Sequence, residues 1–284
     1  MRAEGPNAEQ ITYWNEQTGP KWVAGQERLD RMIAPFGHAA MAALGLRSGE
    51  RVIDVGCGCG DTSLALARQV TASGSVLGVD ISEPMLERAR DRARHDGFSQ
   101  AHFLTADAQT HGFDAGAADA LFSRFGVMFF AHPTAAFANL GRALRAGGRL
   151  AFACWQPVTE NPWMFVPIMA AARVVALPPP PAPDAPGPFA FGDRARVTTI
   201  LQEAGFHDVA IEGFAPSLTV GGGGDLDEAV RFVLQLGPTA AVLRDASPDQ
   251  LTRVSVAVRD ALQPFVTPDG VVMASASWIV TGWR

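Results

Sequence analysis

The chain has 284 residues, of which 48% are hydrophobic and 18% charged, and its formal net charge is -6. This length and apolar content are enough for one full hydrophobic core. The excess of acidic over basic residues argues against a nucleic-acid partner, because phosphate binding requires clustered Lys and Arg.

Cysteine usage and hydropathy favour a cytoplasmic location. The three cysteines are an odd number that falls inside a predicted sheet and a glycine turn, so no disulfide framework is expected. The first ten residues are polar and do not resemble a secretion signal. The longest apolar stretch, 165–177, is interrupted by Pro167 and Arg173 and is shorter than the ~20 residues of a membrane span. We therefore expect no membrane span.

Two helical pieces are predicted near the N-terminus, at 8–14 and 26–44. In the second piece Leu29 and Met32 share one apolar face, and Pro35 weakens the middle. The first piece and the residues after it carry the aromatic cluster Tyr13, Trp14 and Trp22.

The segment 51–60, RVIDVGCGCG, is the most informative part of the chain. Apolar residues lead into Asp54 and then into three alternating glycines, as in a strand that enters a tight turn and then a helix. A second apolar run ends at Asp80, about 20 residues further on, where the next strand of a βαβ unit presents a carboxylate to ribose hydroxyls. The glycine turn and Asp80 together predict a nucleoside cofactor.

The glycine spacing excludes a dinucleotide. Only Cys59 separates Gly58 from Gly60, whereas a dinucleotide fingerprint separates its last two glycines by two residues. Asp54 would repel a pyrophosphate but attract an ammonium group. S-adenosylmethionine carries an amino group, a sulfonium and no phosphate. A nicotinamide-dependent oxidoreductase is therefore disfavoured.

At this point the sequence resembles the class I S-adenosylmethionine-dependent methyltransferases, whose first motif is an acidic residue followed by xGxGxG. Further segments follow in the family's order between about residues 50 and 155. They are a serine-capped helix from Ser82, a third strand before Asp107, a fourth strand with its loop at 119–129, and a glycine turn with a fifth strand at 144–152. The likeness is greatest to the small-molecule branch of ubiquinone and menaquinone biosynthesis.

The resemblance implies an α/β fold: a doubly wound, Rossmann-like, seven-stranded sheet whose last strand is antiparallel, with helical cap or lid insertions. It implies S-adenosyl-L-methionine as cofactor and S-adenosyl-L-homocysteine as product. The cofactor-binding residues that it implies are Tyr13, Trp22, Asp54, Gly56, Cys57, Gly58, Gly60, Asp80, Ile81, Met85, Asp107, Ala108 and Ser123. In the family, the acid after the third strand approaches the adenine amino group, and the N-terminal segment covers the cofactor.

One methyltransferase domain, 1–284, is expected. Its parts are an N-terminal helical flap at 1–45, a cofactor-binding core at 46–156, a proline-rich lid insertion at 157–190, and a C-terminal half at 191–284 with a helical cap insertion at 217–268. In the C-terminal half we expect helices at 193–204, 225–236 and 248–262, a sixth strand at 209–211 and a seventh strand at 271–283.

No residue is a clear catalytic base, and in-line methyl transfer mainly requires positioning and exclusion of water. His132, at a predicted helix entry near the crevice, and His38 are candidates, with a solvent-facing role as the alternative. For Arg124, a buried salt bridge and binding of a substrate carboxylate remain equally open. Cys57 and Cys59 form CxC without partner ligands, so no metal is expected.

Four arginines at 88–94 are interpreted as a solvated helix face with charge pairs. The Met and aromatic residues at 163–169 are interpreted either as the core of a lid or as the wall of a substrate site. The sequence thus predicts methyl transfer to an O, N or C atom of a small, apolar or aromatic metabolite. The alternative is a non-catalytic S-adenosylmethionine-binding protein on the same fold, and a homodimer is left open.

Overall fold

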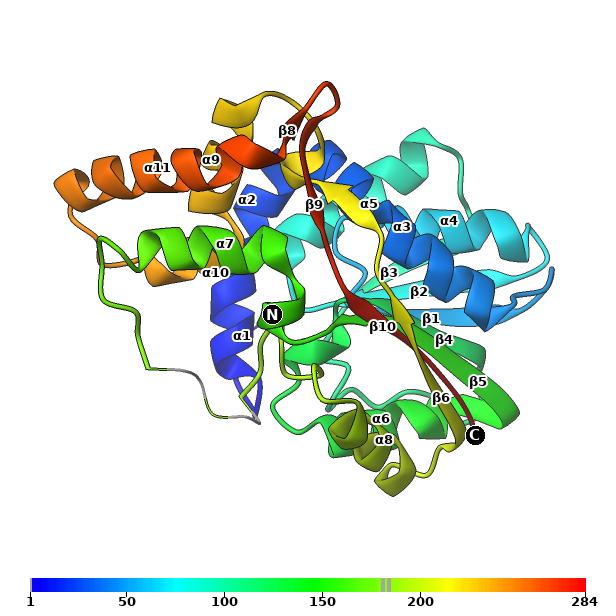
Figure 1. Ribbon diagram of the computed structural model, residues 1–284. Helices are drawn as coiled ribbons and strands as arrows, with labels where there is room; N and C mark the ends of the chain where they lie inside the picture. The colour runs from blue at the N-terminus through cyan, green and yellow to red at the C-terminus, as the bar shows by residue number, and fades with distance from the viewer. Residues whose placement is uncertain (1, 180–181, 183–184) are drawn as a thin grey trace.

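A computed structural model describes residues 2–179, 182 and 185–284. Its main element is a seven-stranded sheet with the order β3-β2-β1-β4-β5-β10-β6 (Figure 1). Strands β1 to β5 are parallel, and β10 runs antiparallel between β5 and β6. The predicted fold class is therefore confirmed. The strands are β1 Arg51–Val55, β2 Ser75–Asp80, β3 Ala101–Thr105, β4 Ala118–Arg124, β5 Leu144–Trp155, β6 His207–Phe214 and β10 Ser277–Trp283.

Helices cover both faces of this sheet, as in a doubly wound fold (Figure 1). One face carries α3 Gln26–Leu44, α4 Asp61–Val70 and α5 Glu83–His95, and the other carries α6 Pro133–Ala143 and α8 Arg194–Glu203. The predicted helix at 26–44 is confirmed, and Pro35 lies inside it without ending it. Fully buried phenylalanines fill the core on both sides: Phe36, Phe122, Phe137, Phe152 and Phe191.

The N-terminal segment is less regular than predicted. It consists of α1 Ala8–Thr12, one turn of π-helix at Tyr13–Gln17, and α2 Gly19–Ala24. The π-helical turn begins where the predicted first helix was expected to continue to Trp14. The segment packs against α5 and the loops at the carboxyl ends of the strands.

A cap of four helices and a small sheet stands at the carboxyl ends of the strands, beside α1 and α2 (Figure 1). Helix α11 packs on α7 and α9, and α10 packs on both of these helices as well. Part of the proline-rich stretch, 180–181 and 183–184, lies outside the described residues. The cap elements are α7 Pro162–Ala171, β7 Ser217–Thr219, α9 Leu226–Gln235, α10 Gly237–Val242, α11 Pro248–Leu262, β8 Val266–Thr267 and β9 Gly270–Ala274. Short 3-10 turns lie at Val127–Phe129, Val158–Glu160, Val220–Gly222 and Gln263–Phe265.

The predicted single strand at 271–283 is wrong, because the chain changes sheets at Ser275 and Ala276. The Ala276 N–H donates to Asn161 Oδ1 at 2.9 Å, and its carbonyl accepts from Asn161 Nδ2 at 3.0 Å. The side chain of Asn161 therefore takes the place of a ladder partner at this point. Only β10, after the break, belongs to the main sheet; β9 pairs with β7 and β8.

The arginine-rich face of α5 is only partly solvated, which corrects the sequence interpretation. Arg88 donates to Gln26 Oε1 at 3.1 Å, and Arg92 donates to Asp30 Oδ2 at 3.1 Å and to the Cys59 carbonyl at 2.8 Å. These two arginines join α5 to α3 and to the glycine turn. Arg94, nearer the end of α5, is exposed. No helix among the described residues has the length and apolar character needed to cross a membrane.

Candidate cofactor and acceptor site

The turn between β1 and α4 is built from glycines in the left-handed region. Gly56, Gly58 and Gly60 have φ of 68°, 54° and 82°, a conformation that costs other residues energy. Gly56 and Gly58 line a cavity at the carboxyl ends of the strands, whereas Gly60 lies away from it and packs against Ala89 of α5. The turn therefore places backbone against the cavity at its first two glycines.

Asp80, at the end of β2, holds this turn in place. Its Oδ2 accepts the Gly58 N–H at 2.8 Å, and its Oδ1 accepts the Ser82 N–H at 2.9 Å. The Ser82 hydroxyl does not cap α5 as predicted but donates to the Trp14 carbonyl at 2.8 Å. Burial raises the pKa of Asp80. Asp80 lines the cavity, and each of its oxygens can accept a second hydrogen bond, which suits the carboxylate to ribose hydroxyls.

Asp54 lies behind the cavity wall rather than in it. It is completely buried, and its Oδ2 accepts the hydroxyls of Thr62 at 2.7 Å and Ser63 at 2.6 Å. Its Oδ1 is buried without a partner among the described residues. Burial raises the pKa of this carboxyl to about 6. Thr62 does line the cavity, so it is the residue that links the Asp54 carboxylate to this space.

Asp107, after β3, is engaged by a residue that the sequence analysis did not identify. The Asn7 amide nitrogen lies 2.9 Å from both Asp107 oxygens, and the Gln109 N–H donates to Oδ1 at 2.9 Å. The Asn7 carbonyl oxygen accepts the Ala131 N–H at 2.8 Å. A single Asn in a polar N-terminus belongs to no motif, so no sequence signal indicated it.

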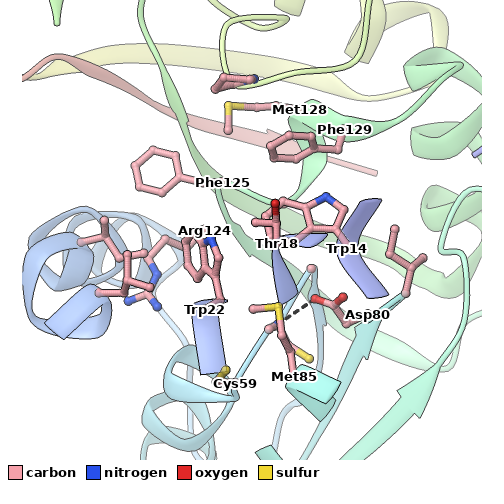
Figure 2. A pocket seen from close by; sticks show the side chains of 18 of the residues that line it. Trp14, Thr18, Trp22, Cys59, Asp80, Met85, Arg124, Phe125, Met128 and Phe129 are labelled. Carbon is pink, nitrogen blue, oxygen red and sulfur yellow. Dashed lines mark hydrogen bonds between the residues drawn. The ribbon is translucent and has the colours of Figure 1, made fainter. Parts of the chain in front are cut away.

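The cavity has a volume of about 300 Å³ and extends from the glycine turn into the cap. Figure 2 shows Asp80 and Met85 at one end and Met128 and Phe129 at the other. We call these the cofactor end and the acceptor end. The acceptor end is formed mainly by apolar side chains: Phe125, Met128, Phe129, Phe130, Trp155, Trp163, Met164, Phe232 and Leu236.

Phe125 has an unusual backbone for its residue type. Its φ is 63°, in the left-handed region, and its ring stacks on Trp155 with centroids 4.0 Å apart and planes 9° apart. A phenylalanine in this region stores strain that the surrounding packing must hold. The result is a flat aromatic surface at the acceptor end.

The aromatic cluster of the N-terminal segment lies on the cavity wall. Tyr13, Trp14 and Trp22 all line the cavity, and the Trp14 ring is 5.3 Å from that of Phe129 (Figure 2). Asn15 fixes this segment, because its amide donates to the Ile81 carbonyl at 2.9 Å and accepts the Glu83 N–H at 3.0 Å. The N-terminal segment is thus a wall of the cavity.

Arg124, at the end of β4, forms the salt bridges that were one of its two predicted roles, whereas binding of a substrate stays a prediction. Its Nη1 donates to Asp61 Oδ2 at 2.8 Å and its Nη2 lies 3.5 Å from Asp30 Oδ1, so it is part of a buried ion-pair network. It also lines the cavity, as does Asp30, which the sequence analysis missed. Burial and the charge of Asp61 raise the pKa of Asp30.

Several residues implied by the sequence do not reach the cavity. His38 and His132 are exposed on the surface, and among the described residues no histidine lines this space. The Ser123 hydroxyl donates to the Val55 carbonyl at 2.7 Å and supports the Gly126 loop from below. Other implied residues do line the cavity. Besides Gly56, Gly58 and the N-terminal aromatics, they are Cys57, Asp80, Ile81, Met85, Asp107 and Ala108.

The two thiols of the glycine turn are not reactive groups. Burial raises the pKa of Cys57 well above its ordinary value and raises that of Cys59 to about 12. Neither thiol ionises near neutral pH, so both are small, neutral wall residues. Within the described residues, no cluster of three or more His, Cys, Asp or Glu could hold a metal ion.

The residues at the cofactor end fit a nucleoside with a cationic, phosphate-free tail. The carboxylates of Asp80 and Asp107 face the cavity as hydrogen-bond acceptors. Asp54, with one unpartnered buried oxygen, adds negative charge behind the turn. This arrangement suits hydroxyl, amino and ammonium donors and opposes a pyrophosphate.

Comparison with known proteins defines the class. Residues 52–148 match the family model described as a methyltransferase domain. With the sheet order and the site, this match shows that the chain carries a class I S-adenosylmethionine-dependent methyltransferase domain, which confirms the resemblance seen in the sequence. The likeness to the ubiquinone and menaquinone branch stays a prediction from the sequence.

Particular relatives are similar over parts of the chain. Aklanonic acid methyltransferase DauC of Streptomyces sp. strain C5 is 34% identical over 137 residues, 46% of this chain and 61% of that protein. The 23S rRNA (uracil(1939)-C(5))-methyltransferase RlmD of Acinetobacter baumannii is 47% identical over 85 residues, 27% of this chain and 18% of that protein. The chain thus spans less than two thirds of the length of these relatives.

Among solved structures, the YcgJ protein of Bacillus subtilis has a TM-score of 0.58 at 15% identity. The superposition covers 88% of this chain and 98% of that one. At this level of identity, the likeness shows that the two proteins share a fold.

Proposed function

We propose that this chain transfers the methyl group of S-adenosylmethionine to a small, planar, largely apolar metabolite. The observation that carries the proposal is the continuity of the cavity. One space of about 300 Å³ joins the polar cofactor end to the aromatic acceptor end. A cofactor and its acceptor can then meet inside a single site, as methyl transfer requires.

The described residues suit each part of this reaction. Asp80 binds the ribose hydroxyls, Asp107 binds the adenine amino group, and Thr62 with Asp54 behind it faces the ammonium of the methionine moiety. Trp14 and Trp22 line the cavity, and aromatic rings there would attract the sulfonium. The cofactor, when bound, supplies an electrophilic methyl group on sulfur.

The acceptor end orients a flat molecule and excludes water. The stacked pair Phe125 and Trp155 and the flexible side chains of Met128 and Met164 suit aromatic substrates of varied outline. No base among the described residues is needed for an acceptor that is already acidic, such as a carboxylate or an activated phenol. We therefore assign an oxygen acceptor on an aromatic acid or phenol.

The relatives support this substrate class. DauC is named for methylation of aklanonic acid and matches over 46% of this chain. The rRNA enzyme matches only 85 residues. The net charge of -6 is unfavourable for binding RNA phosphates and so favours a small molecule over nucleic acid. A cytoplasmic location and a homodimer remain predictions from the sequence.

The test is a methyl-transfer assay with deuterated-methyl S-adenosylmethionine and three acids of increasing ring number: salicylate, 1-hydroxy-2-naphthoate and 1-hydroxyanthraquinone-2-carboxylate. Mass spectrometry should show labelled product that increases with ring number, and Asp80→Ala should reduce it when the cofactor concentration is limiting. Cofactor binding by calorimetry without labelled product, in this panel and in a metabolite extract, would instead support a non-catalytic binding protein. Absence of both binding and product would contradict the proposal.

A further inference from the structure

Asn7 is a buried polar residue in the described part of the N-terminal segment. It is 4% exposed and lines the cavity, although residues 2–6 before it are exposed. Its amide nitrogen is 2.9 Å from both oxygens of Asp107, and its oxygen accepts the Ala131 N–H. The side chain thus joins the loop after β3 to the loop that follows β4. It lies outside the matched methyltransferase domain at 52–148.

The contacts of Asp107 determine which of its lone pairs face the cavity. Oδ1 accepts both the Gln109 N–H and the Asn7 amide, whereas Oδ2 accepts only the Asn7 amide among the described residues. Each carboxylate oxygen accepts about two hydrogen bonds. Oδ2 therefore retains one acceptor position, and the Asn7 amide fixes the plane of the carboxylate and so the direction of that position.

An acceptor held in a fixed direction distinguishes purines by their 6-substituent. Adenine presents an amino group there, which donates to a carboxylate. A 6-oxo purine presents a carbonyl oxygen, which the carboxylate repels. A ligand that leaves a buried polar group of the site unpaired, or places a like charge against it, is rejected strongly. A carboxylate that rotates freely could instead turn to accommodate the wrong ligand.

We propose that Asn7 is a positioning residue for base recognition: it orients the Asp107 carboxylate so that the site accepts a 6-amino purine and rejects a 6-oxo purine. The inference rests on the proposed cofactor. It assigns the selectivity for the base jointly to the methyltransferase domain and to the N-terminal segment, which forms a wall of the cavity.

A structural role for Asn7 predicts a different result, and Asn15 provides the matched control. Asn15 also ties the N-terminal segment to the strand ends, through the Ile81 carbonyl and the Glu83 N–H, but it does not contact Asp107. Removing either side chain should loosen the segment. Only the loss of Asn7 should change the preference between two bases.

The experiment measures the dissociation constants of S-adenosylhomocysteine and S-inosylhomocysteine by calorimetry, for the wild type, Asn7→Ala and Asn15→Ala. We expect the wild type to favour the adenosyl ligand by about 10- to 100-fold, as for hydrogen bonds to a charged acceptor. Asn7→Ala should reduce this ratio to a few-fold. Asn15→Ala should weaken both ligands by the same factor and keep the wild-type ratio.

The outcomes separate this inference from the proposed function. A wild type that binds neither ligand would contradict the proposed cofactor itself. A wild type that binds and discriminates, with the same ratio in Asn7→Ala, would overturn the role of Asn7. Asn7→Leu, which keeps the side-chain volume but lacks the amide, is measured alongside in case the alanine variant does not fold, and thermal denaturation reports folding of each variant.

Discussion

Gly56 and Gly126 touch backbone to backbone: a Cβ on Gly56 would lie 2.7 Å from the Gly126 Cα, and one on Gly126 would lie 2.8 Å from the Gly56 Cα. The loop after β4 is thereby seated on the glycine turn after β1. Because Phe125 directly precedes this contact, the position of the cofactor end and that of the aromatic surface are linked.

Gly126→Ala should destabilise the protein by about 1–3 kcal/mol, because the added methyl group also meets the Val55 carbonyl at 2.7 Å and the packed backbone cannot yield easily. Urea denaturation measures the effect. Gly112→Ala is the matched control, since a Cβ there meets nothing within 4 Å. Equal stabilities of the two variants would show that the two loops are not rigidly seated.

Asp80→Ala should reduce the affinity for S-adenosylhomocysteine by about 10- to 100-fold, because hydrogen bonds to a charged acceptor contribute about 1.5–3 kcal/mol. Calorimetry on the folded variant checks this. Glu87→Ala, at an exposed position of α5, should bind as the wild type does. Unchanged affinity in Asp80→Ala would remove Asp80 from the cofactor site.

The stability of the fold should depend on pH through Asp54. Its pKa is raised by burial from 3.8 to about 6, so the folded state binds this proton more tightly than the unfolded state. The stabilisation by the bound proton is therefore full below about pH 4 and is lost as the pH rises through about 6.

Denaturation of the wild type and of Asp54→Asn between pH 4 and 7 measures this contribution. The wild type should lose up to about 3 kcal/mol more than the variant over this interval, from a shift of about two pKa units. The raised pKa values of Asp30 and Asp80 are common to both proteins and cancel in the comparison. Parallel curves would mean that Asp54 titrates as in the unfolded chain.

Arg124→Met should destabilise the protein by about 3 kcal/mol, the lower end of the range for buried pairs, because the partly buried carboxylates of Asp30 and Asp61 lose this partner and keep only Arg92. Arg94→Met removes an exposed pair with Asp91, in which the two side chains are 71% and 61% exposed, and should change stability by less than about 1 kcal/mol. Similar losses of unfolding free energy in both variants would show that the Arg124 ion pairs are as exposed to solvent as the Arg94 pair.

The sequence by itself determined the class of fold and the cofactor end. The alternating glycines after β1 and the acid at the end of β2 are local patterns, since a turn with positive φ demands glycine and consecutive strands of a βαβ unit present their ends to the same edge. These patterns therefore predicted that Gly56, Gly58 and Asp80 lie together, and the three residues line one cavity. The helix at 26–44 was equally visible, because its apolar periodicity is local.

Only the tertiary structure decided which residues from distant segments share the cavity. Asn7 and Asp107 are 100 positions apart, and two helices and three strands separate Asp30 from Arg124 along the chain, so no spacing in the chain predicts either contact. The same holds for the change of sheets at Ser275, which depends on the side chain of Asn161. Such contacts follow from packing, in which a buried polar group takes whichever partner the fold brings within reach.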